Sequence, residues 1–511
     1  MYYKIIFLTC LCLAFVACKP SSTSETYLSN AEPQNLLSSL SPRILLNGEI
    51  MGNNQSAYLE PNWEGDNLMG DAALLLQQLD YTVNWDESKG ELKATRNAAN
   101  QYGKKMMTFF KNKDLVQIEE KTYRVPKPCV VKSEKLVVAA RFLLEMAGAK
   151  IVEWDKESNS LQAYYYEKLD YGIYFYGKQS TNDSVAGAQK FVPNQTNLFF
   201  DPNKPTIIYT HGWQQGGTKS GGRENFTLKD NSIEVFSHNN WIDKGWNVAI
   251  FHWVQFADDG SIPPPREAEA KIYDIHNTLS NIRWTRSNGA LVTDAALLPS
   301  KNVTELYAEE YAKVFNATYQ GSEIRLVGNS LGGNLTMALL MELHQKNIAK
   351  KPQRITLIDP YWSFNLTSNQ VTFPYNYTDA YQLSTAAAKI YRDQYNAAIE
   401  YFRTSLAGTI GTNDSLIAVT AFSHFGTDYS WNVVNKHTVP VRQYFWSMNF
   451  LPPAELTYLN NVPTGNVAAS ARTPHARIRE LMVNHHYWNH VQGRGTVTPA
   501  DDKYEIREGL R

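Results

Sequence analysis

The stretch Ile324-Arg-Leu-Val-Gly-Asn-Ser-Leu-Gly-Gly333 decides the fold, because a short apolar run passes directly into a glycine-rich turn. The run predicts a buried strand, and the segment from Asn334 to His344, which contains no helix breaker, predicts a helix. Gly328 and Gly332 lie where a side chain would collide with the neighbouring strand and helix. The stretch therefore predicts a strand, a sharp turn and a helix, with Ser330 exposed at the turn.

A Gly-x-Ser-x-Gly turn between a strand and a helix is typical of a nucleophile elbow, which holds a serine hydroxyl above a sheet. The N–H of Leu331 would then lie at the positive end of the helix, where it can donate to an oxyanion. The plain alternative is a glycine-rich turn without chemistry. Asn302-Val-Thr-Glu305 predicts a capped helix just before the strand, and this order of elements favours the elbow with Ser330 as nucleophile.

Length and composition indicate a globular protein with two or more domains. The chain has 511 residues, of which 43% are hydrophobic and 19% are charged. A formal net charge of −1 gives no electrostatic reason to expect a nucleic-acid partner. Aromatic residues are abundant, which suits a large core first and apolar or carbohydrate ligands second.

Residues 1–17 predict an export signal, since Lys4 precedes an apolar run from Ile5 to Val16 that is too short for a membrane span. Phe15-Val-Ala-Cys18 resembles the lipobox of bacterial lipoproteins. The resemblance implies that Cys18 becomes the acylated first residue, and ordinary signal cleavage nearby is the alternative. Residues 18–41 predict a flexible tether. We therefore expect an extracytoplasmic protein that is anchored to a bacterial membrane by lipid.

The cysteine count argues against internal disulfides. Cys10 and Cys12 would leave with the signal and Cys18 would carry lipid, so only Cys129 remains in the folded part. In the apolar run Pro128-Cys-Val-Val131, this thiol is expected to be a small core residue.

Two similar segments, Leu74–Asp86 and Phe142–Asp155, each pass from an amphipathic helix to a strand that ends in Trp-Asp. Neither copy can bury its apolar face alone, so the two are expected to pair. The second copy, with Gly148-Ala-Lys-Ile-Val-Glu-Trp-Asp155, resembles the small α+β domain named for the N-terminal domain of copper amine oxidase. The resemblance covers residues 42–165 and implies a spacer or a binding module of unnamed ligand. A structural platform is the favoured interpretation, and cell-wall or glycan material is a candidate ligand. It implies no copper chemistry, because these residues contain no histidine and a single cysteine.

From about residue 195 onward, apolar runs alternate with long helical or loop segments, which predicts an α/β fold with a mostly parallel sheet. Residues 255–300 are expected to form a loop insertion, and a helix is expected near 380–406. The expected strands are Thr206–Thr210, Val248–Trp253, Ile324–Val327, Ile355–Ile358 and Leu416–Thr420.

Three motifs, His211-Gly-Trp213, Gly328-Asn-Ser-Leu-Gly-Gly333 and Ile355-Thr-Leu-Ile-Asp-Pro360, together resemble the pancreatic-type lipase superfamily of α/β-hydrolases. The resemblance covers roughly residues 200–450, within a predicted lipase-like domain of residues 195–511. It implies cleavage of carboxylic esters, with lipids as the favoured substrates. It also implies that the N–H of Trp213 assists that of Leu331 in the oxyanion hole, and that Asp359 is the catalytic acid.

The acid and the base of a triad must follow the nucleophile in this fold. Asp359 ends a buried-looking strand, where a charge is costly without a partner, although a simple turn cap before Pro360 is the alternative. Asp428 is a second candidate for the acid, in the more usual α/β-hydrolase place. The sequence favours Asp359.

The base is chosen among several later histidines. His437 is preferred, in a loop expected just before an aromatic helix, and His424 is the second candidate. His211 and His252 precede the nucleophile and are expected to be structural. The cluster from Asn484 to His490 lacks a carboxylate in a recognisable ligand motif, so neither a metal nor another cofactor is expected.

Residues 361–412 lie between the acid and the histidine, where a lid over the nucleophile is expected in this fold. The sequence as a whole predicts an exported serine hydrolase that uses Ser330, Asp359 and His437. The alternative is an inactive surface protein that binds cell-wall or glycan material.

Overall fold

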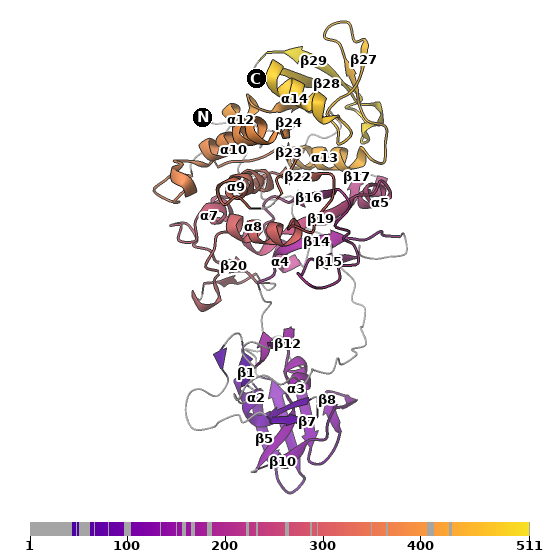
Figure 1. Ribbon diagram of the computed structural model, residues 1–511. Coiled ribbons are helices and arrows are strands. Elements are labelled where there is room, and N and C mark those ends of the chain that lie inside the picture. The colour runs from indigo at the N-terminus through magenta and orange to yellow at the C-terminus, as the bar shows by residue number, and fades with distance from the viewer. Residues whose placement is uncertain are drawn as a thin grey trace. The chain divides into compact units, whose positions relative to one another are not determined.

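The computed structural model describes most of the chain from Arg43 onward. The described residues are 43–46, 49–50, 62–65, 67–79, 81–96, 104–132, 134–149, 151–155, 160–164, 169–180, 187–220, 224–230, 233–260, 265–286, 289–293, 295–348, 350–363, 366–405, 413–428 and 432–509. The predicted export signal, Cys18 and the tether lie outside them. The chain divides between Leu169 and Asp170 into two compact units, which are described separately (Figure 1).

The first unit is rich in β-structure. Three sheets have the strand orders β12-β13-β1-β2, β10-β11-β4-β3 and β5-β6-β7-β8-β9. Its elements are β1 (Arg43–Leu46), β2 (Glu49–Ile50), β3 (Asn62–Glu64), β4 (Asn67–Asp71), α2 (Ala72–Gln78), β5 (Tyr81–Asp86), β6 (Glu91–Arg96), β7 (Met106–Phe110), β8 (Leu115–Ile118), β9 (Lys121–Arg124), β10 (Val130–Lys132), β11 (Lys135–Ala139), α3 (Ala140–Met146), β12 (Ile151–Asp155) and β13 (Ser160–Tyr164).

The two repeats pair as expected. Strands β4 and β11, which directly precede the repeat helices, run antiparallel with Asp71 opposite Val137. Leu76 of α2 and Leu144 of α3 are fully buried in one shared core. Cys129 belongs to the same core, where burial raises the pKa of its thiol to about 11. The thiol is therefore a small apolar core group, as its surroundings in the sequence predict.

The second unit is built on a 12-stranded sheet with the order β15-β14-β19-β16-β22-β23-β24-β25-β28-β29-β26-β27. The strands from β19 to β28 in this order pair parallel to their neighbours. The strands of the unit are β14 (Gly172–Tyr176), β15 (Ala188–Lys190), β16 (Thr206–Thr210), β17 (Thr227–Asp230), β18 (Ile233–Phe236), β19 (Asn247–His252), β20 (Trp284–Thr285), β21 (Leu291–Val292), β22 (Ile324–Asn329), β23 (Arg354–Ile358), β24 (Ala398–Arg403), β25 (Ala421–His424), β26 (Ala454–Leu456), β27 (Pro463–Val467), β28 (His486–Gln492) and β29 (Lys503–Glu508). A mostly parallel sheet confirms the predicted fold class.

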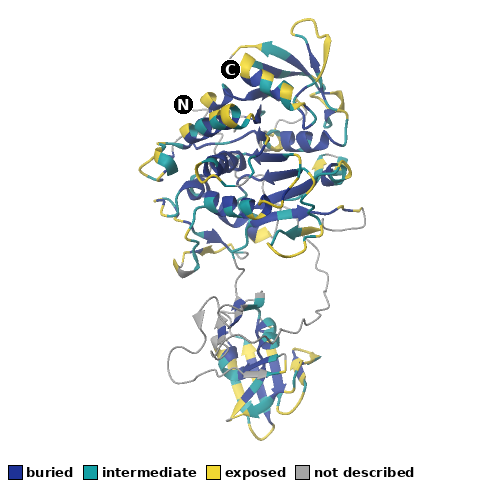
Figure 2. Cartoon of the chain, in the orientation of Figure 1, coloured by how far each residue is buried: buried dark blue, intermediate teal, exposed yellow. Residues whose placement is uncertain are grey.

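Helices cover the sheet on two faces, and Figure 1 shows α8, α9 and α10 on one side with α5 and α13 on the other. The helices are α4 (Gly217–Ser220), α5 (Ser237–Asp243), α6 (Val254–Ala257), α7 (Arg266–Tyr273), α8 (Val303–Val314), α9 (Leu331–Gln345), α10 (Ala380–Tyr395), α12 (Asp414–Ile417), α13 (Val433–Trp446) and α14 (His475–Asn484). The central strands are buried throughout, as their dark blue colour in Figure 2 shows. Among the described helices, none combines the length and the apolar character that crossing a bilayer requires.

Helix α8 begins as its sequence predicts. The Asn302 side chain accepts from the Glu305 N–H, and the Glu305 carboxylate accepts from the Asn302 N–H, which forms a capping box. The capped helix leads into β22, so the chain enters the elbow from a fixed direction.

The region between Asp359 and His437 differs from expectation. The segment expected to be one helix near 380–406 ends at Tyr395, because Asn396 adopts the left-handed conformation with φ 52° and terminates it. The chain then forms β24, which pairs with β23 and β25. Part of the predicted lid is therefore an integral strand of the sheet.

Three other boundaries also differ. The run Leu416–Thr420 is not a strand: α12 covers its start, capped by the Asn413 side chain, and β25 begins only at Ala421. His437 lies within α13 and not in a loop ahead of it. Residues 255–300 contain the buried helix α7 and are not simply a loop insertion.

Candidate active site

Ser330 lies at the sharp turn between β22 and α9 and has the left-handed φ of 55° with ψ −128°. The turn is possible because no side chain intervenes: a Cβ on Gly328 would lie 2.5 Å from the Gly332 carbonyl oxygen, and a Cβ on Gly332 would lie 2.1 Å from the Thr210 carbonyl oxygen. A strained residue at this position is the feature of an elbow that exposes its hydroxyl. Within the described residues, Ser330 Oγ makes no hydrogen bond to a side chain, so the hydroxyl is uncommitted.

Asp359 lies one strand away from Ser330, because β22 and β23 are parallel neighbours and Asn329 is opposite Ile358. The Ser330 N–H donates to the Ile358 carbonyl oxygen over 3.2 Å, which links the two strand ends directly. The Asp359 side chain is fully buried. Its Oδ1 accepts from the Thr404 N–H at 2.9 Å and from the Ser405 N–H at 3.2 Å. These bonds fix the carboxylate at the end of β23.

His437 extends from α13 to this carboxylate, and its Nδ1 lies 2.5 Å from Asp359 Oδ2. A carboxylate oxygen can only accept, so Nδ1 carries the proton and Nε2 is left free to accept another. The imidazole retains 18% of its surface exposed, while the acid is buried. The structure thus brings together two of the residues that the sequence selects, in the arrangement that orients a general base.

Ser405 is a site residue that sequence reasoning missed. Its hydroxyl donates to Asp359 Oδ2, and it lies 3.3 Å from His437 Nδ1. It follows β24 at the same edge of the sheet as the acid. Recognition of β24 as a strand would have indicated it, because the ends of adjacent parallel strands lie side by side.

The loop after β16 lies against Ser330. A Cβ on Gly212 would lie 2.7 Å from Ser330 Cβ and 3.2 Å from Ser330 Oγ. Among the described residues, neither the Trp213 N–H nor the Leu331 N–H donates to another protein group. One of these amides adjoins Ser330 in the chain, and the other adjoins Gly212, whose backbone lies against Ser330.

His211 is structural, as the sequence predicts. It is fully buried, and burial lowers the pKa of its imidazole to about 4, so the ring is neutral. Its Nδ1 donates to the Gly212 carbonyl oxygen at 2.9 Å, and its Nε2 accepts from the Trp253 N–H at 3.3 Å. Both nitrogens are therefore engaged in holding the loop. His252 is likewise engaged, with its Nε2 3.0 Å from the Tyr176 hydroxyl.

The other candidates for acid and base lie elsewhere. Asp428 is 63% exposed and pairs with Arg494 at 2.8 Å. His424 is exposed at the end of β25. His490 is buried, and its Nε2 lies 3.1 Å from Asp502 Oδ1. Among the described residues, no group of three or more His, Cys, Asp or Glu side chains is placed to hold a metal ion.

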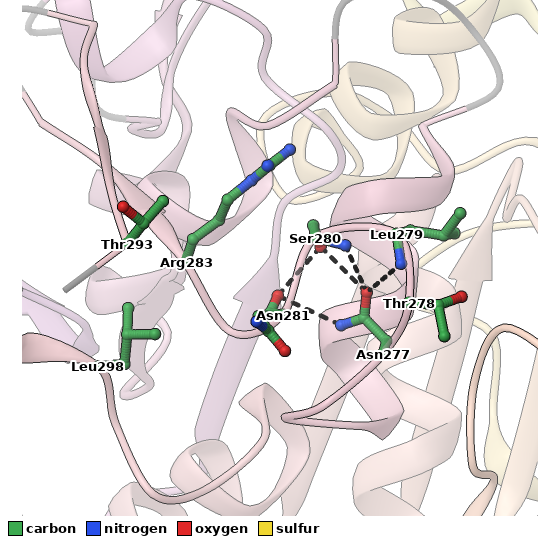
Figure 3. Close-up of a pocket in the computed structure, with 8 residues that line it drawn as sticks. All are labelled: Asn277, Thr278, Leu279, Ser280, Asn281, Arg283, Thr293 and Leu298. Atoms are coloured by element: carbon green, nitrogen blue, oxygen red, sulfur yellow. Dashed lines mark hydrogen bonds between the residues drawn. The ribbon is translucent and has the colours of Figure 1, made fainter. Parts of the chain in front are cut away.

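A cavity of about 260 Å³ lies outside this arrangement (Figure 3). None of the residues at the elbow or of the Asp359–His437 pair lines it. Asn277 Oδ1 accepts from the Ser280 N–H and hydroxyl, and its Nδ2 donates to the Asn281 carbonyl oxygen, so these polar groups serve the turn itself. The cavity is lined by Asn277, Thr278, Leu279, Ser280, Asn281, Arg283, Thr293 and Leu298.

Comparison with known proteins agrees with the architecture. Residues 49–163 match the family model described as copper amine oxidase N-terminal domain, and residues 264–422 match the model described as alpha/beta hydrolase fold. A search of the curated proteins finds no match.

Similar solved structures include a putative carboxylesterase from Lactobacillus plantarum WCFS1, with 13% identity over 46% of this chain and 77% of that one and a TM-score of 0.21. A lipase/esterase from Lactobacillus plantarum has 15% identity over 44% of this chain and 75% of that one, with a TM-score of 0.21. An acylaminoacyl peptidase from Pyrococcus horikoshii has 10% identity over 64% of this chain and 47% of that one, with a TM-score of 0.22.

The sheet order, the elbow between β22 and α9 and the family match over residues 264–422 converge on one architecture. The N-terminal match agrees with the paired repeats and their common core. The chain combines a domain similar to the copper amine oxidase N-terminal domain with a domain of the α/β-hydrolase fold.

Proposed function

We propose that the protein is a serine hydrolase that cleaves carboxylic esters through an acyl-enzyme at Ser330. The observation that carries the proposal is the hydrogen bond between His437 Nδ1 and the buried Asp359 carboxylate, one strand from a strained serine. A buried acid that orients an imidazole is the pairing that general-base activation of a serine needs.

In the proposed reaction, His437 Nε2 takes the proton from Ser330 Oγ as the oxygen attacks the ester carbonyl carbon. The N–H groups of Trp213 and Leu331 donate to the oxyanion that forms on the carbonyl oxygen. The tetrahedral intermediate then collapses, and the imidazolium gives its proton to the departing alcohol. Water then attacks the acyl-serine through the same steps, with His437 as base and then as acid, and the carboxylic acid is released. Asp359 keeps the imidazole in the working tautomer throughout.

We propose an ester with an apolar acyl group as substrate, and lipids are the favoured class. Tyr361 and Trp362 follow Asp359 after Pro360, and the Tyr361 N–H donates to the Ser330 carbonyl oxygen at 3.1 Å. This hydrogen bond holds the backbone of an aromatic segment against the turn at Ser330. A series of p-nitrophenyl esters from two to sixteen carbons tests this, and kcat/KM that is highest for the shortest acyl group would argue against lipids.

Labelling with a fluorophosphonate tests the nucleophile. Wild type and the control Ser322→Ala, a change at an exposed position outside the site, should label and turn over p-nitrophenyl esters, whereas Ser330→Ala should do neither. Absence of both labelling and turnover in wild type would refute the enzyme and favour an inactive binding protein.

We also propose where the protein is located in the cell. The segment from Lys4 to Cys18 supports export and acylation at Cys18. Metabolic labelling with tritiated palmitate in a bacterial host should mark wild type and Cys129→Ser but not Cys18→Ser. Cell-wall or glycan material remains the proposed ligand of the N-terminal domain, and cosedimentation of the full chain with peptidoglycan tests it.

A further inference from the structure

The loop that carries Trp213 is held by one short segment, residues 253–259, which comprises α6 and its flanks. The Gln214 N–H donates to the Ala257 carbonyl oxygen at 3.0 Å. The Trp213 indole N–H donates to the Asp259 carbonyl oxygen at 2.9 Å. At the near end of the loop, the Trp253 indole N–H donates to the His211 carbonyl oxygen at 2.9 Å. The position of the loop is therefore set by contacts that lie outside the proposed triad.

The Asp258 side chain also holds this loop in position. One carboxylate oxygen accepts from the Gly216 N–H, and the other accepts from the Thr218 N–H at 3.0 Å. The side chain is only 8% exposed, and burial raises its pKa. A buried carboxylate that bonds two backbone amides of one turn fixes the shape of that turn.

Asp259, next in the chain, is held by two cations. Lys271 Nζ lies 2.9 Å from Asp259 Oδ2, and Arg283 binds both carboxylate oxygens at 2.8 and 3.1 Å. Lys271 is fully buried on α7, and burial lowers the pKa of its ammonium to about 8. Arg283 also lines the cavity in Figure 3. Buried ion clusters contribute little net stability, so a role in fixing position accounts for this one better.

These contacts converge on the nucleophile through Gly212. Because a Cβ there would lie 2.7 Å from Ser330 Cβ, the loop backbone packs directly against Ser330 and only glycine fits at this position. A shift of the loop away from Ser330 withdraws the Trp213 N–H from the oxyanion. We propose that Asp258 and Asp259 are positioning residues that keep the Trp213 N–H in the oxyanion hole. Lys271 and Arg283 hold Asp259 in place for this role. The inference rests on the proposed serine hydrolase.

The first test compares Asp258→Ala with Asp274→Ala. Asp274 is the control, because its carboxylate also accepts from two backbone amides, those of His276 and Thr372, each at 2.8 Å. Among the described residues, it forms no hydrogen bond to the loop that carries Trp213. For each variant, active sites are titrated with a fluorophosphonate, and kcat and KM for a p-nitrophenyl ester are expressed per titrated site. This normalisation removes any unfolded fraction.

The expected result is a fall in kcat of about 10- to 100-fold for Asp258→Ala with KM within about threefold, since a misplaced oxyanion donor weakens the transition state and not the ground state. Affinity for a trifluoromethyl ketone, whose adduct with serine carries the same oxyanion, should fall in parallel. Asp258→Asn retains one acceptor oxygen and should recover part of kcat. Asp274→Ala should keep the wild-type kcat.

Hydrogen exchange followed by mass spectrometry provides a readout that does not depend on activity. The amides of residues 214–218 should exchange faster in Asp258→Ala than in wild type, and at the wild-type rate in Asp274→Ala. If Asp258→Ala keeps both the wild-type kcat per site and the wild-type exchange, the inference is overturned while the proposed function stands. If wild type neither labels nor turns over, the proposed function fails, and unchanged exchange in Asp258→Ala would separately refute the role of Asp258 in ordering the loop.

Discussion

Asp359→Asn is the most informative single change at the site. The carboxylate uses Oδ1 for the amides of Thr404 and Ser405, and Oδ2 for His437 Nδ1 at 2.5 Å. An asparagine oxygen can keep the two amide bonds, which places the side-chain NH₂ against the imidazole. Because NH₂ can only donate, Nδ1 must lose its proton and Nε2 must gain it. The imidazole is then in the wrong tautomer to act as a base towards Ser330.

The expected loss follows from that tautomer. Replacement of a triad aspartate by asparagine lowers kcat by about 10⁴-fold when geometry is kept. At about 1.4 kcal/mol for each factor of ten, the barrier rises by about 5 kcal/mol. KM should change little, since the acid does not touch the substrate. The variant should remain folded, because the change removes a buried charge and retains two hydrogen bonds.

The assay measures kcat with a p-nitrophenyl ester, after circular dichroism has shown equal folded fractions. Asp428→Asn is the control, since Asp428 is the other candidate acid and pairs with Arg494 at the surface. It should stay within about twofold of wild type, as surface ion pairs contribute little. An Asp359→Asn variant that keeps more than a tenth of the wild-type kcat, or a large loss in Asp428→Asn, would refute this reasoning.

Three further predictions concern groups around the site. Ser405→Ala removes a hydroxyl that donates to the buried acid, and kcat should fall about tenfold with KM unchanged, as for a lost charge-assisted hydrogen bond; steady-state kinetics checks this. Gly212→Ala places a methyl group 2.7 Å from Ser330 Cβ and should abolish fluorophosphonate labelling, whereas Gly495→Ala, where a Cβ would meet no atom within 4 Å, should label normally. Burial raises the pKa of the Glu269 carboxyl from 4.5 to about 7. Between pH 4.5 and pH 7, the folded state therefore keeps a proton that the unfolded state has already lost. The free energy of unfolding should therefore fall by about 3 kcal/mol as pH rises through this window in wild type relative to Glu269→Gln, and urea titrations at pH 4.5 and 7.5 measure the difference.

The elbow could be predicted from the sequence because it depends on local chemistry. Gly328 is required by contacts within the turn and the first turns of α9, and the capping box at Asn302 is formed within four consecutive residues. The proximity of Asp359 to Ser330 follows from the order of parallel strands, which a run of apolar residues reveals. These features needed no knowledge of distant contacts.

The site features that the sequence did not predict follow from the unexpected end of one helix. The helix that begins at Ala380 has no glycine or proline at its end, and it stops because Asn396 takes a left-handed backbone that asparagine tolerates at low cost. Because this helix end was not predicted, strand β24 was not predicted either. Ser405, which follows β24 and lies beside the acid, was missed for the same reason. His437 was expected in a loop ahead of an aromatic helix, but α13 begins at Val433 and includes this histidine. The role of His437 came from resemblance, and the structure supplies its hydrogen bond to the acid.

The ends of β23 and β24 offer the imidazole two neighbouring contacts. His437 Nδ1 lies 2.5 Å from the Asp359 carboxylate and 3.3 Å from the Ser405 hydroxyl. An aspartate introduced at position 405 would approach the same nitrogen from the adjacent strand. In the proposed triad, the acid can therefore be supplied from either of two adjacent strands, and the imidazole keeps a partner while one acid replaces the other.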